Sequence, residues 1–406
     1  MVRKYKKELL YLLFAYIVVV ILSYILHSQA YVKEINSTTM AFSYDYGFIS
    51  RGLLGTIYQL LDKAIPIDMM TAEALFMFLH VVTALFFIGL FMFFAYALYK
   101  CAAETRRLII HLSIGLAIWT VPTFVSMDGF GRLDIYCLSL SLIMASLIIA
   151  RRCEWLVPIL SAISILIHHG NVFMFMNIPL VLLIYRALSE KEKARQKHYA
   201  VLFLSTFATV SVLFLYFEFF SHIAGQTAYE EIIENAKKLS FFNRYHEGLV
   251  LHEILGLSVA ASEVECKIIN LVQLPFFIVI MLPQIITVCK TYKNTIKKSI
   301  AGVEKFKYMC VFAGVITVVP ELVLKCDYGR YMFFILTYYA VMFISMIAMC
   351  DEVITNELLN FEERLKHKKY LFYYYPFVLQ PIYDVDIITL TYVAGELLNI
   401  GVLHWW

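Results

Sequence analysis

Long apolar runs separated by short polar clusters organise the chain from near its start to about residue 350. A membrane-spanning helix needs ~20 predominantly apolar residues, and most of these runs approach that length. The alternating pattern of an outer-membrane barrel, in segments of ~10 residues, is absent. The pattern therefore predicts ten helices, at about 9–27, 74–99, 108–125, 135–150, 155–167, 172–186, 199–220, 268–289, 307–324 and 331–349.

Two long polar stretches interrupt these runs, at 28–73 and 221–267, and we expect them to form two larger loops. In the first loop, apolar residues at 53, 54, 57, 60, 61 and 65 have helical spacing, which predicts an amphipathic helix lying at the membrane interface. The alternative is that this helix is only an interfacial anchor. An amphipathic segment is expected at 350–370, and the tail at 370–406 supplies either another span or a re-entrant piece.

Composition supports the membrane interpretation. Hydrophobic residues make up 61% of the 406 residues and charged residues only 16%, whereas soluble domains carry about 25% charged residues. The chain is therefore expected to be a single all-α membrane domain, 1–406, with about 10–11 transmembrane helices. No Lys/Arg run is interleaved with aromatic residues, which argues against nucleic-acid binding. The cysteines form no CxxC pair, which argues against zinc or redox chemistry, although a Cys266–Cys326 disulfide stays open.

Clusters of Lys and Arg predict the orientation, because cytoplasmic loops of membrane proteins are enriched in these residues. Basic clusters occur at the N-terminus ("MVRKYKK"), after the second, fourth, sixth and eighth predicted helices, and in 350–370. We therefore expect a cytoplasmic N-terminus and place both large loops on the extracytoplasmic side.

Three similar phrases fall on that outer side: "YDYGFISRGLLG" at 44–55, "MDGFGRLDIY" at 127–136 and "CDYGRYM" at 326–332. Lys and Arg are usually enriched on the cytoplasmic side, so the presence of Arg51, Arg132 and Arg330 at the outer boundary requires an explanation. A guanidinium group binds phosphate bidentately, and the three arginines together predict a diphosphate site. The alternative is that each arginine pairs with a nearby aspartate, as the four-residue spacing of Asp128 and Arg132 would allow.

The acidic and aromatic residues of these phrases are further candidates. Asp45 could accept a proton from an attacking hydroxyl or hold a divalent cation against a phosphate, so it is a catalytic candidate and a divalent cofactor stays open. The tyrosines of the phrases can donate hydrogen bonds to a sugar or stack on it. The remaining candidates for substrate binding are Asp128, Asp134, Asp327, Tyr46 and Tyr328.

The stretch "SILIHHGNVFMF" places His168 and His169 at the end of the fifth predicted helix. An ionisable residue at membrane depth usually marks a functional site, and histidine carries protons near neutral pH. The alternative is that these rings only bind terminal carbonyl groups of the helix. A metal site is disfavoured because adjacent histidines project to different faces. Glu218, near the outer end of the seventh helix, is also costly in lipid and could line the same functional site as the two histidines.

This layout resembles two groups of bacterial membrane glycosyltransferases. The GT-C class has an acid in the first external loop beside an amphipathic helix, and here that acid would be Asp45, a single residue rather than a pair. O-antigen and capsule polymerases have about ten to twelve helices and periplasmic arginines that bind polyprenyl-diphosphate saccharides, which would correspond to Arg51, Arg132 and Arg330. The resemblance implies a bacterial cytoplasmic membrane, polyprenyl-linked donor and acceptor, and polysaccharide-assembly proteins as partners.

The function that this resemblance implies is transfer or polymerisation of polyprenyl-(di)phosphate-linked sugars on the outer face, with Asp45 or His169 as the base. A transporter or flippase for a lipid-linked or anionic substrate is the main alternative. Such proteins place ionisable groups near the bilayer midplane, on broken helices in paired repeats, whereas most polar groups here cluster at outer helix ends. A membrane O-acyltransferase is a third option, because "SRGLLG" resembles an Arg-Gly-Leu phrase of those enzymes, but their accompanying pattern is missing.

Overall fold

A computed structural model describes residues 5–126, 129–221, 223, 225–255, 274–299, 302–324 and 328–368. All regular elements in these ranges are helices. Six of them are long and apolar enough to cross a membrane, which confirms the all-α class and a multi-pass membrane protein. These six are α1 (Lys6–His27), α4 (Ala72–Lys100), Ala103–Val125 containing α5 (Arg106–Val125), α10 (Lys193–Phe219), Gly302–Val323, and Gly329–Ala348 in α18 (Tyr328–Ala348).

Three of the ten predicted spans correspond to apolar helices that are shorter than the six named above. They are α6 (Asp134–Ala150), α7 (Leu156–Ile167) and α9 (Asn177–Ser189). The 12 residues of α7 rise roughly 18 Å, against a hydrocarbon core of ~30 Å. The apolar run is broken after Ile167 by the polar turn that precedes α8 (Asn171–Met174). The helix predicted at 155–167 therefore coincides with α7, whereas the single helix predicted at 172–186 is divided into α8 and α9.

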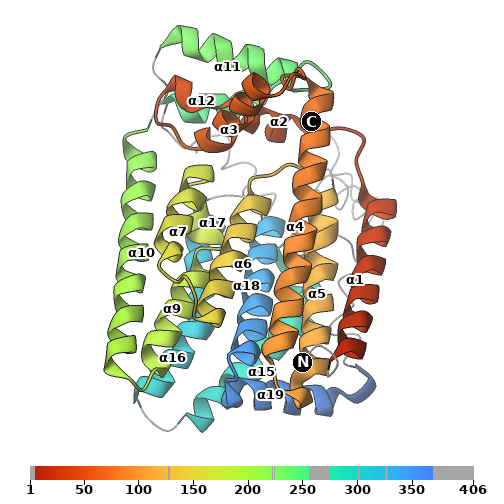
Figure 1. Cartoon of the computed structure of the whole chain (residues 1–406), viewed down its shortest axis with the longest axis vertical. Coiled ribbons are helices and arrows are strands. Elements are labelled where there is room, and N and C mark those ends of the chain that lie inside the picture. The colour runs from red at the N-terminus through yellow and green to blue at the C-terminus, as the bar shows by residue number, and fades with distance from the viewer. Residues whose placement is uncertain are drawn as a thin grey trace.

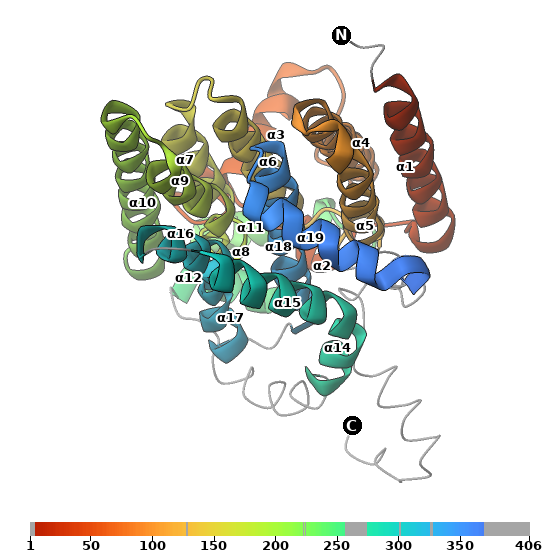
Figure 2. The same cartoon turned by 90° about the horizontal axis from the view of Figure 1, so that it is seen from below.

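The predicted span at 268–289 is also different in the part that the structure describes. It contains α14 (Leu274–Ile280) and α15 (Leu282–Lys298), separated by Met281. Pro283 lies in the first turn of α15, where a residue without an N–H donor is tolerated at a helix start. Helix α15 continues through the basic cluster that we expected to be a loop, and it lies beside α19 (Glu352–Leu365) across one end of the bundle (Figure 2).

The centre of the bundle is formed by α5 and α18, whose apolar side chains are almost all buried. Helices α1 and α10 lie at opposite edges (Figure 1). Both expose long rows of apolar side chains, including Phe14, Ile25, Leu204 and Val212. Such rows are typical of helices that face lipid rather than water.

Four helices cover one end of the bundle: α2 (Glu34–Ala41), α3 (Gly52–Ala64), α11 (Gln226–Lys238) and α12 (Glu247–Leu255) (Figure 1). We call this the α3 end, and α3 matches the amphipathic helix predicted in the first loop. The two predicted loops meet here, because the Asn235 amide donates to the Tyr46 hydroxyl at 3.0 Å and the His246 N–H donates to Thr38 at 3.0 Å.

The opposite end, which we call the α19 end, is joined by buried polar contacts. Asp351 caps α19 by accepting a hydrogen bond from the N–H of Ile354 at 2.8 Å. The same carboxylate accepts hydrogen bonds from Tyr185 at 2.5 Å and Tyr308 at 3.0 Å. His111 of α5 also contacts Glu362 of α19. The amphipathic segment predicted at 350–370 is therefore packed against the bundle up to residue 368, and the tail at 370–406 lies outside the described residues.

Candidate functional site

The first predicted phrase is held against the bundle by close backbone packing. A Cβ on Gly55 would lie only 1.7 Å from the carbonyl oxygen of Phe42, so only glycine lets α3 pack directly on this backbone. Arg51, just before α3, adopts a left-handed conformation with φ 63°. The preceding residue, Ser50, is buried, and its N–H donates to the hydroxyl of Ser221 at 3.2 Å. The sharp turn therefore places Ser50 inside and Arg51 beside it.

A second turn, after α7, brings both predicted histidines to Ser50. The Ser50 hydroxyl forms a hydrogen bond with Nδ1 of His169. On the other side of the ring, Nε2 of His169 lies 3.6 Å from a carboxylate oxygen of Glu218, which comes from α10. A base that contacts a hydroxyl on one side and an acid on the other is suited to proton transfer. These three residues form a chain, Ser50–His169–Glu218, in which Ser50 and His169 are buried and the Glu218 side chain is 40% exposed.

Arg330 and Asp134 form a bidentate ion pair. Nε of Arg330 donates to Oδ2 of Asp134 at 2.8 Å, and Nη2 donates to Oδ1 at 2.6 Å. Asp134 is fully buried at the start of α6, and the Arg330 side chain on α18 is 15% exposed. Arg330 is thus paired with an aspartate 196 residues away in sequence. The alternative interpretation, in which each arginine pairs with an aspartate nearby in sequence, did not include this partner. This pair fixes the guanidinium group of Arg330 and neutralises part of its charge.

His168 lies close enough to the three predicted arginines to be affected by the charge of each. Its ring is buried, with 8% exposure, and among the described residues its Nδ1 has no hydrogen-bond partner. Burial lowers the pKa of His168 well below its usual value, and the positive charges of Arg51, Arg330, His169 and Arg132 lower it further. His168 is therefore neutral at neutral pH. Arginines from three distant segments thus act on one buried ring that has an available nitrogen.

The structure does not bring Asp45 into this cluster. Asp45 is exposed in the short helical turn η2 (Tyr44–Tyr46), and its N–H is directed to the hydroxyl of Ser43 at 3.3 Å. Its carboxylate makes no hydrogen bond or ion pair with any residue that the structure describes. The predicted base at Asp45 therefore lacks the geometric support that His169 has. Five other candidates cannot be placed: Asp128, Asp327, Cys266 and Cys326 lie outside the described residues, as does the side chain of Tyr328.

Two members of the cluster were not predicted as site residues. Ser50 lies inside the first phrase, but a serine in a Gly-rich loop carries no signal of its own. Glu218 had a signal, because an acid in an apolar helix is costly, but the sequence did not identify His169 as its neighbour. Tyr46, predicted to contact substrate, instead joins the two loops through Asn235.

Aromatic side chains border the cluster on the α10 side. The ring of Phe48 lies 5.3 Å from the rings of Tyr44 and Tyr216 and 5.2 Å from that of Phe217. Phe48 and Tyr216 are partly exposed. Burial raises the pKa of Tyr44 to about 12, so its hydroxyl stays protonated. This aromatic rim is suited to stack on a sugar or to hold an isoprenoid chain.

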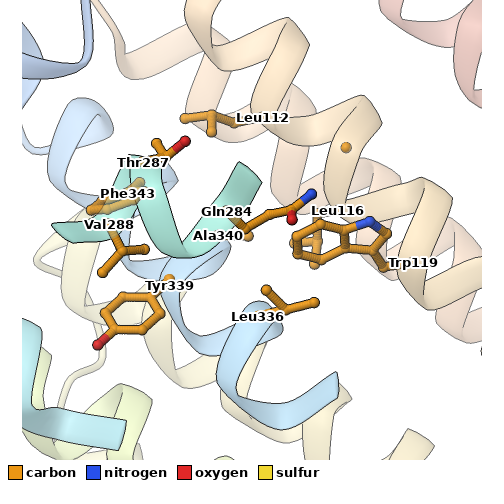
Figure 3. A pocket seen from close by; sticks show the side chains of 11 residues that line it. Leu112, Leu116, Trp119, Gln284, Thr287, Val288, Leu336, Tyr339, Ala340 and Phe343 are labelled. Carbon is orange, nitrogen blue, oxygen red and sulfur yellow. The ribbon is translucent and has the colours of Figure 1, made fainter. Parts of the chain in front are cut away.

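A metal site and a closed cavity elsewhere in the bundle are the other two candidate sites. Among the described residues, no group of three or more His, Cys, Asp or Glu side chains could hold a metal ion, and a divalent cofactor stays an open prediction. A cavity of about 60 Å³ lies between α5, α15 and α18, lined by apolar side chains with Gln284 and Thr287 (Figure 3). This volume holds only a few water molecules, so the cavity is too small for a lipid-linked sugar.

Comparisons with known proteins give no family for this chain. No protein-family model matches it, and neither any curated protein nor any solved structure matches it. The function is therefore inferred from the cluster itself.

Proposed function

We propose that this protein transfers a glycosyl group from a polyprenyl-(di)phosphate-linked donor to a saccharide acceptor in cell-surface polysaccharide assembly. The transfer would occur at the α3 end, on the outer face of a bacterial cytoplasmic membrane. The observation that carries the proposal is the convergence of Arg51, Arg132 and Arg330 on His168, next to the chain Ser50–His169–Glu218. This arrangement combines an anion-binding region with a proton acceptor.

The arginines would bind the phosphate groups of the donor. The positive charges of Arg51, Arg132 and Arg330 all act on His168, and the charge of Arg330 is shared with Asp134. As the bond between the sugar C1 and the phosphate oxygen breaks, negative charge develops on the departing phosphate. Guanidinium groups already in place stabilise that charge without reorganisation. Arg330 is held in place by its two hydrogen bonds to Asp134.

His169 would accept the proton of the acceptor hydroxyl as its oxygen attacks C1. Glu218, 3.6 Å from Nε2, would stabilise the imidazolium that forms. Ser50 orients the ring through Nδ1. Because Nδ1 and Nε2 both face protein groups, the acceptor hydroxyl would replace Ser50 or Glu218 as the ring's partner, or reach His169 through the Ser50 hydroxyl. The products are an elongated saccharide and a free polyprenyl diphosphate.

The test is glycosyl transfer by the full-length protein in proteoliposomes supplied with lipid-linked saccharides. Arg51→Gln and Arg132→Gln should each lower the rate by about 10²-fold or more, since loss of one preorganised donor to a developing charge costs that much. Arg244→Gln is the matched control: its side chain is 73% exposed at the same end and lies 3.8 Å from Glu34. Normal product from both cluster variants, at normal protein levels in the membrane, would reject the proposal.

A lipid-linked saccharide flippase or other transporter is the second candidate, and one observation favours it. Several helices are interrupted: α7, α8 and α9 are short, and the 3-10 segment η4 (Gly314–Val318) separates α16 (Gly302–Ala313) from α17 (Val319–Leu324). Asn177 joins these breaks by donating to the Gly314 carbonyl at 3.2 Å and the Thr317 hydroxyl at 3.1 Å. Transporters build substrate sites from discontinuous helices. Movement of labelled lipid-linked saccharide across vesicles without new glycosidic bonds would favour this candidate.

A further inference from the structure

An apolar groove runs between α4 and α6, away from the histidine cluster. Its walls are formed by side chains from Val82 to Tyr96 of α4 and from Tyr136 to Ala150 of α6, and Arg152 lines one end. We call it the α4/α6 groove. Its volume of about 770 Å³ is within the range of about 300–1,000 Å³ that is typical of ligand sites. From Val82 to Tyr96 the helix rises roughly 21 Å, which exceeds the ~15 Å depth of one leaflet's hydrocarbon region.

A glycine keeps the middle of this groove open. A Cβ built on Gly89 meets no atom within 4 Å, whereas Cβ atoms on Gly55 and Gly129 would collide with backbone. Gly89 is therefore not required by helix packing within the described structure. Glycine in a helix interior is less favourable than alanine by about 1 kcal/mol. Its neighbours along the groove, Leu85 and Met92, are both more than half exposed, so the groove opens to the bundle surface.

The end of the groove that lies toward α19 is cationic. Arg152 is exposed and has no carboxylate partner among the residues described. The nearby charges are already engaged: Arg151 contacts Glu190 at 2.5 Å, and Glu154 accepts a hydrogen bond from Tyr199 at 2.5 Å. Lys100, at the end of α4, lies 5.7 Å from the ring of Tyr96, which also lines the groove.

Exposed aromatic residues place this end near a membrane interface. Trp155 is 62% exposed three residues after Arg152, and Tyr99 is exposed on the last turn of α4. Trp and Tyr are enriched at the level of lipid headgroups. The α4/α6 groove is long and apolar, and it ends at headgroup depth near two cations, Arg152 and Lys100. This combination is complementary to an anionic lipid.

We propose that the α4/α6 groove binds an anionic phospholipid of the leaflet at the α19 end. One acyl chain would occupy the groove past Gly89, and the headgroup phosphate would contact Arg152 with support from Lys100. A free anion would gain nothing from the apolar walls, and a zwitterionic lipid would gain less from the two cations. This site does not depend on the proposed glycosyl transfer, since the groove shares no lining residue with the histidine cluster.

Native mass spectrometry of the full-length protein in detergent, with added phosphatidylglycerol or phosphatidylcholine, tests the headgroup contact. The unaltered protein should bind phosphatidylglycerol more tightly. Arg152→Gln should weaken phosphatidylglycerol binding about fivefold, which corresponds to about 1 kcal/mol per cation near an anionic lipid surface, and should leave phosphatidylcholine binding unchanged. Lys297→Gln removes an exposed charge from α15, which lies across the α19 end, and should have no effect. Equal phosphatidylglycerol binding by Arg152→Gln and the unaltered protein would overturn the proposal.

The groove itself is tested by filling it. Gly89→Leu should fold normally, because its side chain enters open space, and should lower the binding of both lipids. Ala84→Leu, on an exposed position of α4 that does not line the groove, is the matched control and should bind lipid normally. Unchanged lipid binding by Gly89→Leu would also overturn the proposal. If Gly89→Leu instead lowered the melting temperature with no change in lipid binding, a segment of this chain would be the occupant and the lipid assignment would be wrong.

Discussion

Removal of the Asp134 carboxylate should destabilise the protein strongly. Asp134 is fully buried, Arg330 is 15% exposed, and two hydrogen bonds of 2.6 and 2.8 Å join them. Asp134→Ala leaves the guanidinium group buried without this carboxylate. Breaking a buried ion pair from one side costs about 3–5 kcal/mol. We therefore expect the free energy of unfolding to fall by about that amount, measured by reversible unfolding in mixed micelles.

A paired substitution separates the ion pair's structural role from its functional role. The double variant Asp134→Leu/Arg330→Met replaces both charges with apolar groups, which is often neutral for stability. It should therefore recover most of the stability lost by Asp134→Ala, while glycosyl transfer stays absent because the phosphate-binding guanidinium group is gone. Activity that recovers together with stability would show that Arg330 has only a structural role.

An exposed ion pair provides the control for this comparison. Lys238 and Glu234 lie 2.6 Å apart on the surface of α11, where solvent screens their attraction. Glu234→Gln should leave unfolding unchanged. The reasoning is refuted if Asp134→Ala is as stable as Glu234→Gln, or if the double variant is less stable than Asp134→Ala.

Three further predictions concern the α3 end. Gly55→Ala should prevent normal packing of α3, because its Cβ would lie 1.7 Å from a backbone oxygen; expression and melting temperature should fall, whereas Gly89→Ala should lower neither, because alanine is favoured over glycine in a helix interior. Glu218→Gln should lower the rate of glycosyl transfer about 10–100-fold and shift the acidic limb of the pH–rate profile, because His169 loses the acid that stabilises its charged form. An unchanged pH–rate profile would exclude this role of Glu218. Because the pKa of His168 is lowered in the folded protein, the unfolded chain binds more protons below about pH 6.5. Melting temperature should therefore fall as pH decreases from 6.5 to 5, and His168→Gln should flatten this dependence; equal slopes would contradict it.

Hydropathy predicted the long helices because each apolar run of sufficient length must satisfy its backbone hydrogen bonds in lipid. The same pattern predicted α7 with nearly its observed bounds, but it did not predict the division of the next apolar run into α8 and α9. Periodicity could not show that the polar turn after α7 belongs inside the bundle, because its position depends on contacts with Ser50 and Glu218. At α15, the basic cluster indicated a loop, but a helix can present lysines on one face and apolar residues on the other.

The candidate site was predictable in part. Arginines that depart from the usual charge bias identified three segments, and the structure brings Arg51, Arg132 and Arg330 near His168. The specific partners were not predictable, because the Asp134–Arg330 pair joins α6 to α18 and exists only once these helices pack. Asp45 was chosen for its tyrosine neighbours, but local composition does not determine whether a loop residue faces inward.

Binding of a polyprenyl diphosphate to the purified full-length protein tests the central claim most directly, because that claim is a single anion site built from three distant arginines. We predict saturable binding that weakens at least tenfold in Arg51→Gln and in Arg132→Gln, and that is unchanged in Arg244→Gln. Binding that is absent in the unaltered protein, or that all three variants retain equally, would contradict the account.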